Sequence, residues 1–300
     1  MHPQQSLEDL LRSHRAWQGF QLLGLEYVSR SLFTLYKAVV KDNEGHLRRW
    51  AVKQTASAHM AACEANGLRA LRQLTRHIPT VHWPLADTDL EQSGSLLIMD
   101  YIARGRVTRS ALMDCLRELY NSECNQEQGF GWSSSNMIGS LPQLNRWYDS
   151  FSAYWLDSRI EAQLRLARQS GQLSAAECRV VIGFTEQCIE AWDLDFHCRP
   201  HLIHGDLWSG NILTDEEGTI YLIDPAVSYG HPEQDLAMLQ LFGAVVSCQD
   251  CDQLLMAIGA RAGFAQRIGF WQLYPLLVHV NLFGSAYKSQ LLSAIKSTPV

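Results

Sequence analysis

The residues before position 100 and those after it follow different patterns, and this contrast constrains the fold more than any other feature. Residues 27–40 and 50–53 are rich in aromatic and β-branched residues, and the turn-forming sequence KDNEG lies between them at 41–45. Apolar and branched stretches separated by such a turn are typical of antiparallel strands. The sequence therefore predicts a β-hairpin near the start of the chain.

A helix is predicted over residues 58–76, where strong helix formers dominate and three leucines recur at helical spacing. Pro79 follows and is expected to end it. The next apolar run, at 95–99, is short enough for a buried strand and ends in Met99. Residues 1–100 are therefore expected to form a small lobe of strands and one helix.

Beyond residue 110 the pattern is mainly helical. Two short strands, 212–213 and 219–223, are predicted on either side of the turn sequence TDEEG. The predicted helices cover residues 109–122, 143–168, 174–195, 233–247 and 268–292. The expected fold is thus α+β and bilobal, with a small mixed lobe (1–100) and a larger helical lobe (101–300). A ligand cleft is expected between them.

Composition excludes several classes of protein. The chain is 47% hydrophobic and carries a net charge of −6, with no basic tract longer than Arg48-Arg49. Binding to nucleic acid through phosphates needs a clustered positive surface, so that function is not expected. No stretch has the roughly 18 consecutive apolar residues of a membrane span, and residues 1–20 lack the apolar core of a signal peptide. We therefore expect a cytoplasmic protein whose eight cysteines are reduced thiols.

The most informative segment is HLIHGDLWSGN at 201–211, followed by Asp224 at the end of the second predicted strand. An H-x-D-x-x-x-x-N loop that leads into two strands ending in Asp is the arrangement that a kinase-like fold uses for phosphoryl transfer. Asp206 on the loop can accept the proton of an attacking hydroxyl. The hairpin would return Asp224 beside Asn211, where two oxygen atoms can hold a Mg²⁺ ion that bridges the phosphates of ATP.

A kinase-like small lobe should also supply a lysine for the phosphates and a carboxylate that orients it. Lys53 ends an apolar strand, and Glu64 lies eleven residues later in the predicted helix. Either residue alone could be an ordinary surface charge. Together with the loop, they predict an ion pair in the nucleotide site, to which we also assign Met99.

Six segments resemble the fructosamine kinases (ketosamine-3-kinases), a family within the wider group of aminoglycoside phosphotransferases and choline-kinase-like proteins. The resemblance covers about residues 25–290. Its segments are EANGLRAL at 64–71, NMIG at 136–139 with PQ at 142–143, HGDLWSGN at 204–211, IDPAV at 223–227, YGHPE at 229–233 with DLAM at 235–238, and HVNLFG at 279–284. The continuation LWSGN and the segment DPAV distinguish this family from the wider group.

The resemblance implies transfer of the γ-phosphate of ATP to the 3-hydroxyl of a fructosamine or ribulosamine, free or on a protein. The resulting 3-phosphate is unstable and releases the amine, so the reaction amounts to deglycation. By the same resemblance, Asp206 is the base, and Asn211 and Asp224 are the Mg²⁺ ligands. Asp235, with His204, would support the catalytic loop, although Asp235 could equally be a helix N-cap.

Three residues are assigned to the acceptor side by this resemblance. The indole of Trp208, inside the catalytic loop, would stack on the sugar, and the alternative is a packing role in the core. His279 and Asn281 lie in a late helix that would line the acceptor. A buried histidine whose hydrogen bonds are satisfied within the protein is an equally good reading of His279.

The expected nucleotide loop departs from the family pattern. Fructosamine kinases usually carry Gly-Gly-x-Ile-Asn there, whereas this chain has SRSLF at 29–33. Glycine lets backbone N–H groups approach phosphates closely. The hydroxyls of Ser29 and Ser31 are the candidate replacements. Two alternatives therefore remain open, namely a kinase for an aminoglycoside or another amino-alcohol, and a pseudokinase that binds without turnover.

Overall fold

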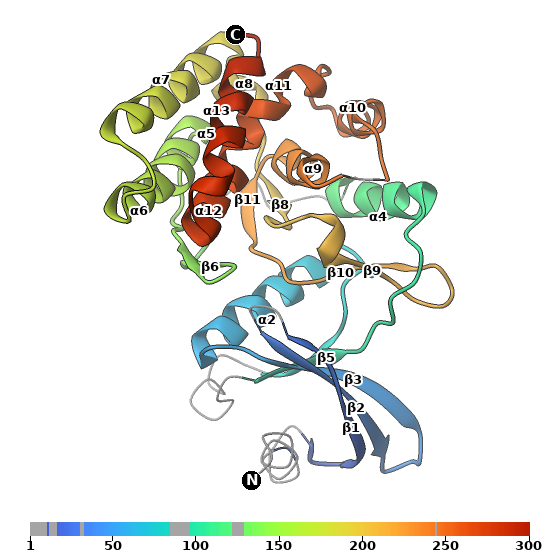
Figure 1. Ribbon diagram of the computed structural model, residues 1–300. Coiled ribbons are helices and arrows are strands. Elements are labelled where there is room, and N and C mark those ends of the chain that lie inside the picture. The colour runs from blue at the N-terminus through green and yellow to red at the C-terminus, as the bar shows by residue number, and fades with distance from the viewer. Residues whose placement is uncertain (1–10, 12–16, 31–32, 85–95, 122–128, 244) are drawn as a thin grey trace.

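The computed structural model describes residues 11, 17–30, 33–84, 96–121, 129–243 and 245–300. Figure 1 shows a small lobe, made of one twisted sheet and helix α2, next to a larger and mainly helical lobe. The strand of this sheet that comes last in the sequence ends at Asp100, close to the predicted boundary between the lobes. Among the described residues, no helix has both the length and the apolar character needed to cross a membrane.

The small lobe is an antiparallel sheet of five strands in the order β1-β2-β3-β5-β4, with α2 (Ala58–Arg72) beside it. Its strands are β1 (Phe20–Arg30), β2 (Thr34–Asp42), β3 (Leu47–Gln54), β4 (Val81–Trp83) and β5 (Leu96–Asp100). The prediction of a single strand over 27–40 is wrong, because the chain reverses within it and Tyr27 pairs with Tyr36. Polar Ser29 and Arg30 interrupt the apolar run at this reversal.

In the described part of the large lobe, three two-stranded ribbons are present, β6–β7, β8–β11 and β9–β10. Their strands are β6 (Asn136–Ile138), β7 (Leu141–Gln143), β8 (His201–Ile203), β9 (Ile212–Thr214), β10 (Ile220–Leu222) and β11 (Ser228–Gly230). The predicted hairpin with TDEEG at its turn is confirmed as β9–β10. The other two ribbons were not predicted, because strands of three residues leave almost no periodic signal.

The helices of this lobe are α4 (Arg109–Asn121), α5 (Phe151–Ala153), a π-helix (Tyr154–Glu161), α6 (Ala162–Gln169), α7 (Ala175–Ala191), α8 (Leu194–His197), α9 (Pro232–Leu241), α10 (Cys248–Ala257), α11 (Phe264–Trp271), α12 (Leu273–Phe283) and α13 (Lys288–Ser297). The helix predicted over 109–122 is confirmed. The one predicted over 143–168 begins only at Phe151, where Ser150 caps it. The one predicted over 268–292 is broken at Gly284, whose φ of 79° is left-handed.

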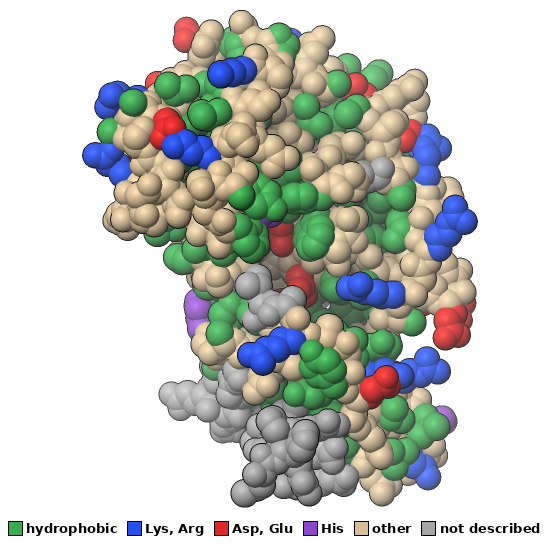
Figure 2. All heavy atoms as spheres, viewed as in Figure 1, with side chains coloured by type: hydrophobic (Ala, Val, Ile, Leu, Met, Phe, Trp, Pro, Cys, Tyr) green, Lys and Arg blue, Asp and Glu red, His purple; other side chains and the backbone are tan. Residues whose placement is uncertain are grey.

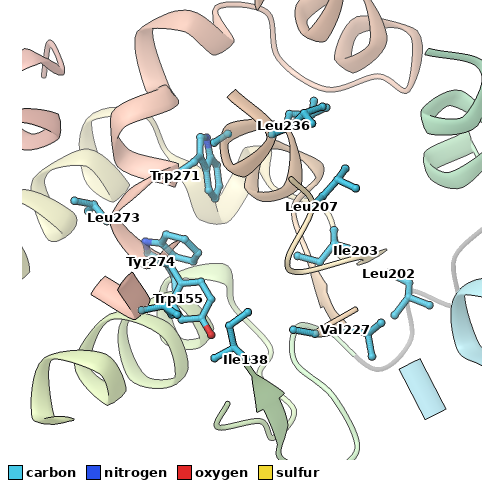
Figure 3. Close-up of a cluster of buried hydrophobic side chains, with 14 of the residues drawn as sticks. Ile138, Trp155, Leu202, Ile203, Leu207, Val227, Leu236, Trp271, Leu273 and Tyr274 are labelled. Carbon is cyan, nitrogen blue, oxygen red and sulfur yellow. The ribbon is translucent and has the colours of Figure 1, made fainter. Parts of the chain in front are cut away.

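The buried apolar side chains form two clusters, and the larger one spans both lobes. Trp50 and Trp83 belong to the cluster of the small sheet, whereas the larger cluster extends from α2 through the helical lobe. In Figure 3, Ile203 and Leu207 from the predicted catalytic loop pack near Leu236 of α9. All three side chains are buried. The loop is thus anchored on both sides by the core.

A buried ion pair joins the start of α9 to α11. Arg267 donates two hydrogen bonds to the carboxylate of Glu233, at 2.6 and 3.0 Å, and Trp271 donates a third. Glu233 and Arg267 are both almost inaccessible to solvent. His231 caps the same helix by accepting from the backbone N–H of Glu233 and stacks on Trp271. The segment that carries Asp235 is therefore fixed from several directions.

Replacing Glu233 with glutamine should destabilise the protein by about 3 kcal/mol, because Arg267 would remain buried without a counter-charge. Urea denaturation of the two proteins measures the difference. Asp114→Asn is the matched control, since Asp114 pairs with Arg117 at the surface and an exposed pair contributes less than about 1 kcal/mol. Equal effects of the two substitutions would contradict this account of α9.

Candidate active site

The loop that follows β8 is held by one buried carboxylate. Asp235 of α9 accepts hydrogen bonds from the backbone N–H groups of His204 and Gly205, both at 2.7 Å. The hydroxyl of Tyr120 donates to the same carboxylate at 2.9 Å. Gly205 has a φ of 82°, and a Cβ there would lie 2.0 Å from the carbonyl oxygen of Ala226. Only glycine fits this position, so the local geometry requires the glycine of the HGD sequence.

His204 ties the loop to the hairpin. Its Nε2 donates to the carbonyl of Ile223 at 2.9 Å, and its Nδ1 accepts from the backbone N–H of Asp206 at 3.3 Å. Burial lowers the pKa of His204 to about 4, so the ring is neutral at pH 7 and can accept and donate at once. The structure thus places both residues predicted to support the loop in contact with it.

Asp206 lies at the centre of the site. Burial, together with the negative charge of Asp224, raises the pKa of Asp206 to about 7. The side-chain amide of Asn211 donates to both the backbone carbonyl and the carboxylate of Asp206, at 2.8 and 3.1 Å. These bonds use the amide nitrogen of Asn211 and leave its oxygen Oδ1 to serve as a ligand.

The hairpin returns Asp224 to Asn211, as the sequence predicts. The backbone N–H of Ile223 donates to the carbonyl of Asn211 at 3.0 Å. Asp224 follows directly and has a left-handed φ of 56°, which is uncommon for a residue other than glycine. The backbone after it is held by two buried amides, because Asn136 donates to the carbonyl of Val227 and Gln143 donates to that of Ala226.

Lys53 of β3 is buried between two carboxylates. Its Nζ lies 2.7 Å from Glu64 of α2 and 2.9 Å from Asp224. Burial alone would lower the pKa of Lys53, but the two carboxylates raise it above its usual value, so the lysine is charged. Burial alone would raise the pKa of Asp224, but the charge of Lys53 lowers it below its usual value. The ring of Phe33 lies 4.6 Å from Nζ, a contact that sequence reasoning missed because Phe33 belongs to no recognised motif.

Two cavities meet at Asp206. The first, a cleft of about 400 Å³, lies between the lobes, and acidic side chains are visible in the hollow there in Figure 2. It is lined by eight of the residues singled out in the sequence, namely Ser29, Lys53, Glu64, Met99, Asp206, Trp208, Asn211 and Asp224. Ser31 lies outside the described residues.

The second cavity is a pocket in the helical lobe, lined by Asp206, Gly205, Trp155, Tyr274 and His279 among others. Most of its lining is aromatic or apolar, its polar side chains include Gln143, Arg159, Ser228 and Gln234, and its volume is about 20 Å³. Asn281 is not part of the lining of either cavity, since its amide donates to Gln163 of α6 at 2.8 and 3.0 Å. Its assignment to the acceptor stays a prediction.

The oxygen atoms of Asn211 and Asp224 fit a magnesium ion better than a metal held by protein groups alone. In the described part of the chain, no three His, Cys, Asp or Glu side chains are grouped as a metal site. Mg²⁺ typically binds through one or two protein oxygens and completes its octahedron with phosphates and water. A carboxylate and an amide oxygen in a nucleotide-sized cleft match that requirement.

A two-lobed fold with a buried lysine–carboxylate pair, an HGD loop and the Asn211–Asp224 pair defines an ATP-dependent phosphotransferase of the protein-kinase-like class. A model of the fructosamine kinase family matches residues 37–298. The chain belongs to the fructosamine kinase family.

Curated relatives and a solved structure agree with this assignment. The chain is 33% identical to the "Probable ketoamine kinase" of Enterococcus faecium over 76% of this chain and 79% of that protein. It is 34% identical to the chloroplastic protein-ribulosamine 3-kinase of Arabidopsis thaliana, over 77% and 70% of the two chains. The crystal structure of a "putative fructosamine-3-kinase" from Thermobifida fusca superposes with a TM-score of 0.78 at 28% identity, covering 95% of this chain and 96% of the other.

Replacing Asp206 with asparagine should stabilise the fold at pH 8 by roughly 2 kcal/mol, because the buried carboxylate no longer has to ionise. The pKa of Asp206 is raised from 3.8 to about 7 by folding, so its contribution to stability is lost as the pH rises from about 4 to 7. Urea denaturation at pH 5 and pH 8 measures this. The advantage of the variant should shrink at pH 5, and a variant less stable than the parent at pH 8 would contradict the burial of this charge.

Proposed function

We propose that this chain transfers the γ-phosphoryl group of ATP to the 3-hydroxyl of a ketosamine, with Mg²⁺ as the metal ion. One observation carries the proposal. Asp206 lines both the cleft that contains Lys53, Asn211 and Asp224 and the separate pocket in the helical lobe. A hydroxyl bound in the pocket and a phosphate bound in the cleft would therefore meet at this carboxylate.

The transfer step balances with these residues. The acceptor oxygen forms a bond to the γ-phosphorus while the bond from that phosphorus to the β–γ bridging oxygen breaks, and ADP leaves. Asp206 takes the proton of the attacking hydroxyl. A base with a pKa near the working pH is effective in this role, and burial supplies that pKa. Asn211 keeps the carboxylate oriented through its hydrogen bond.

The phosphates are expected to interact with Lys53, which Glu64 holds in place from the other side. Asp224 and Asn211 would hold Mg²⁺, which neutralises charge on the phosphates when bound. Ser29 lines the cleft, and of the two serines predicted to replace the loop glycines it is the one that the structure describes. The aromatic ring of Phe33 also lines the cleft, next to Lys53.

The ketosamine acceptor is inferred from the family and from the names of the relatives, which are ketoamine and protein-ribulosamine kinases. The pocket beside Asp206 is small, with a volume of about 20 Å³, so it suits a hydroxyl group of the acceptor rather than the whole sugar.

The proposed activity predicts ATP consumption with Mg²⁺ in the presence of fructoselysine or ribuloselysine, and none above background with an aminoglycoside or choline. Asp206→Asn should lower turnover by at least about a thousandfold, because the proton of the acceptor would have no base. Coupled measurement of ADP release across this panel tests both statements. Turnover only with the aminoglycoside would reassign the acceptor, and a variant near the parental rate would remove Asp206 from the mechanism.

Mg·ATP should raise the melting temperature of the protein, since a ligand that binds only the folded state stabilises it. A concentration a hundred times the Kd corresponds to about 2.7 kcal/mol. Asp224→Ala should lose most of the Mg²⁺-dependent part of the shift, whereas Asp206→Asn should keep it. Thermal unfolding with ATP, with and without Mg²⁺, measures this. An absent shift in the parent protein would favour a role without catalysis.

A further inference from the structure

A row of aromatic rings runs from the cleft, which Trp208 lines, to the pocket, which His279 lines. We call the rings of Trp208, Phe242, His279, Phe283 and Tyr287 the aromatic strip. The ring centroids of Trp208 and Phe242 are 5.9 Å apart, and those of Phe242 and His279 are 5.0 Å apart. His279 also contacts Phe283 at 5.5 Å and Tyr287 at 4.8 Å. These rings come from the catalytic loop, the residue that caps the end of α9, helix α12 and the short 3-10 helix after it (Gly284–Tyr287).

The aromatic strip is open to solvent. Trp208 and Phe242 are each 36% exposed, and Phe283 is 55% exposed. Contiguous exposed apolar surface is uncommon on soluble proteins and usually marks a binding site. Figure 2 shows hydrophobic side chains of the helical lobe gathered at the edge of the hollow between the lobes. The structure therefore raises the question of what the strip contacts.

The position of the strip relates it to the acceptor. Trp208 lines the cleft, His279 lines the pocket, and Asp206 belongs to both cavities. An acceptor whose hydroxyl reaches Asp206 can extend its other end toward either of these two rings and farther along the strip. In a ketosamine, the amine is attached two carbon atoms away from the 3-hydroxyl, so the group carried by the amine extends outward from the reacting end.

The rings of the strip favour an ammonium group, and the charged side chains near it are held by other protein groups. Burial lowers the pKa of His279, so its ring is neutral at pH 7. Lys288, next to Tyr287, is paired with Glu177 at 2.7 Å. In the pocket, Arg159 donates to the carbonyl of Leu144 and to Asn145. The charge of Lys288 is thus compensated by Glu177, whereas Arg159 is held by neutral groups inside the pocket. The faces of the aromatic rings in the strip attract a positive charge.

We propose that the aromatic strip binds the substituent of the ketosamine amine and makes the enzyme prefer ketosamines with apolar or aromatic substituents over those of short anionic amino acids. This inference rests on the proposed function, and it adds a substrate class and a specificity surface to it. The sugar occupies the region near Asp206, the secondary ammonium lies against ring faces, and the substituent covers Phe283.

Three fructosamines that differ only in the amine test this proposal, namely the adducts of glycine, butylamine and benzylamine. We expect kcat/KM for the benzylamine adduct to exceed that for the glycine adduct by about tenfold, with the butylamine adduct between them. Phe283→Ala should lower kcat/KM for the benzylamine adduct by about fivefold, mainly through KM, and should affect the glycine adduct less than about twofold. Because Phe283 is largely exposed, its removal leaves no cavity in the core.

Phe196→Ala is the matched control, because Phe196 is 63% exposed on α8 and is not part of the strip or of either cavity lining. It should leave all three kcat/KM values at the parental level. Equal kcat/KM for the three adducts, or an equal loss on all three in Phe283→Ala, would overturn the proposal while the kinase activity stands. Lack of turnover with every adduct would instead overturn the proposed function.

Discussion

Two hydrogen bonds from backbone N–H groups to one buried carboxylate determine where the chemistry takes place. Asp235 receives them from His204 and Gly205, and Asp206 follows directly in the chain. The loop can approach Ala226 this closely only because position 205 has no side chain. Asp235 is itself fixed, since α9 is capped by His231 and joined to α11 by the buried Glu233–Arg267 pair. A carboxylate buried inside the helical lobe thus positions Asp206, the carboxylate that we propose as the base.

The same burial adjusts the protonation of the site. Asp206, Asp224 and Glu64 lie near a single lysine, and burial opposes ionisation of all three. Lys53 contacts both Asp224 and Glu64, and its charge lowers the pKa of Asp224. Burial still raises the pKa of Glu64 to about 8 despite this contact, and burial with the charge of Asp224 raises the pKa of Asp206 to about 7. A base must be able to take up a proton during the reaction, whereas a metal ligand must stay ionised. The opposite shifts of Asp206 and Asp224 suit the roles that we propose for them.

The sequence predicts the fold class and the hairpin beneath the candidate site, but not the shortest ribbons or the contacts between distant residues. The spacing of Asp206, Asn211 and Asp224 is fixed by a short hairpin with a clear turn, and the structure has this hairpin where it was expected. The Lys53–Glu64 pair follows from similar local reasoning. The contact of Lys53 with Phe33 and the amides of Asn136 and Gln143 under the hairpin involve residues far apart in the chain. Contacts between distant residues leave no periodicity or spacing in the sequence from which they could be predicted. Strands of only three residues are likewise too short to show a periodic pattern.

The helix break at Gly284, which the sequence did not predict, shapes the surface beside the pocket. His279, Phe283 and Tyr287 are spaced by four residues, so a continuous helix would align them along one face. In that helix, His279 and Tyr287 would be separated by about 12 Å along the axis. Instead, α12 ends at Phe283, the chain turns at Gly284, and the ring of Tyr287 lies 4.8 Å from that of His279. The break therefore converts a helical stripe into a compact group of rings beside the pocket, where a substituent of modest size can contact several of them at once.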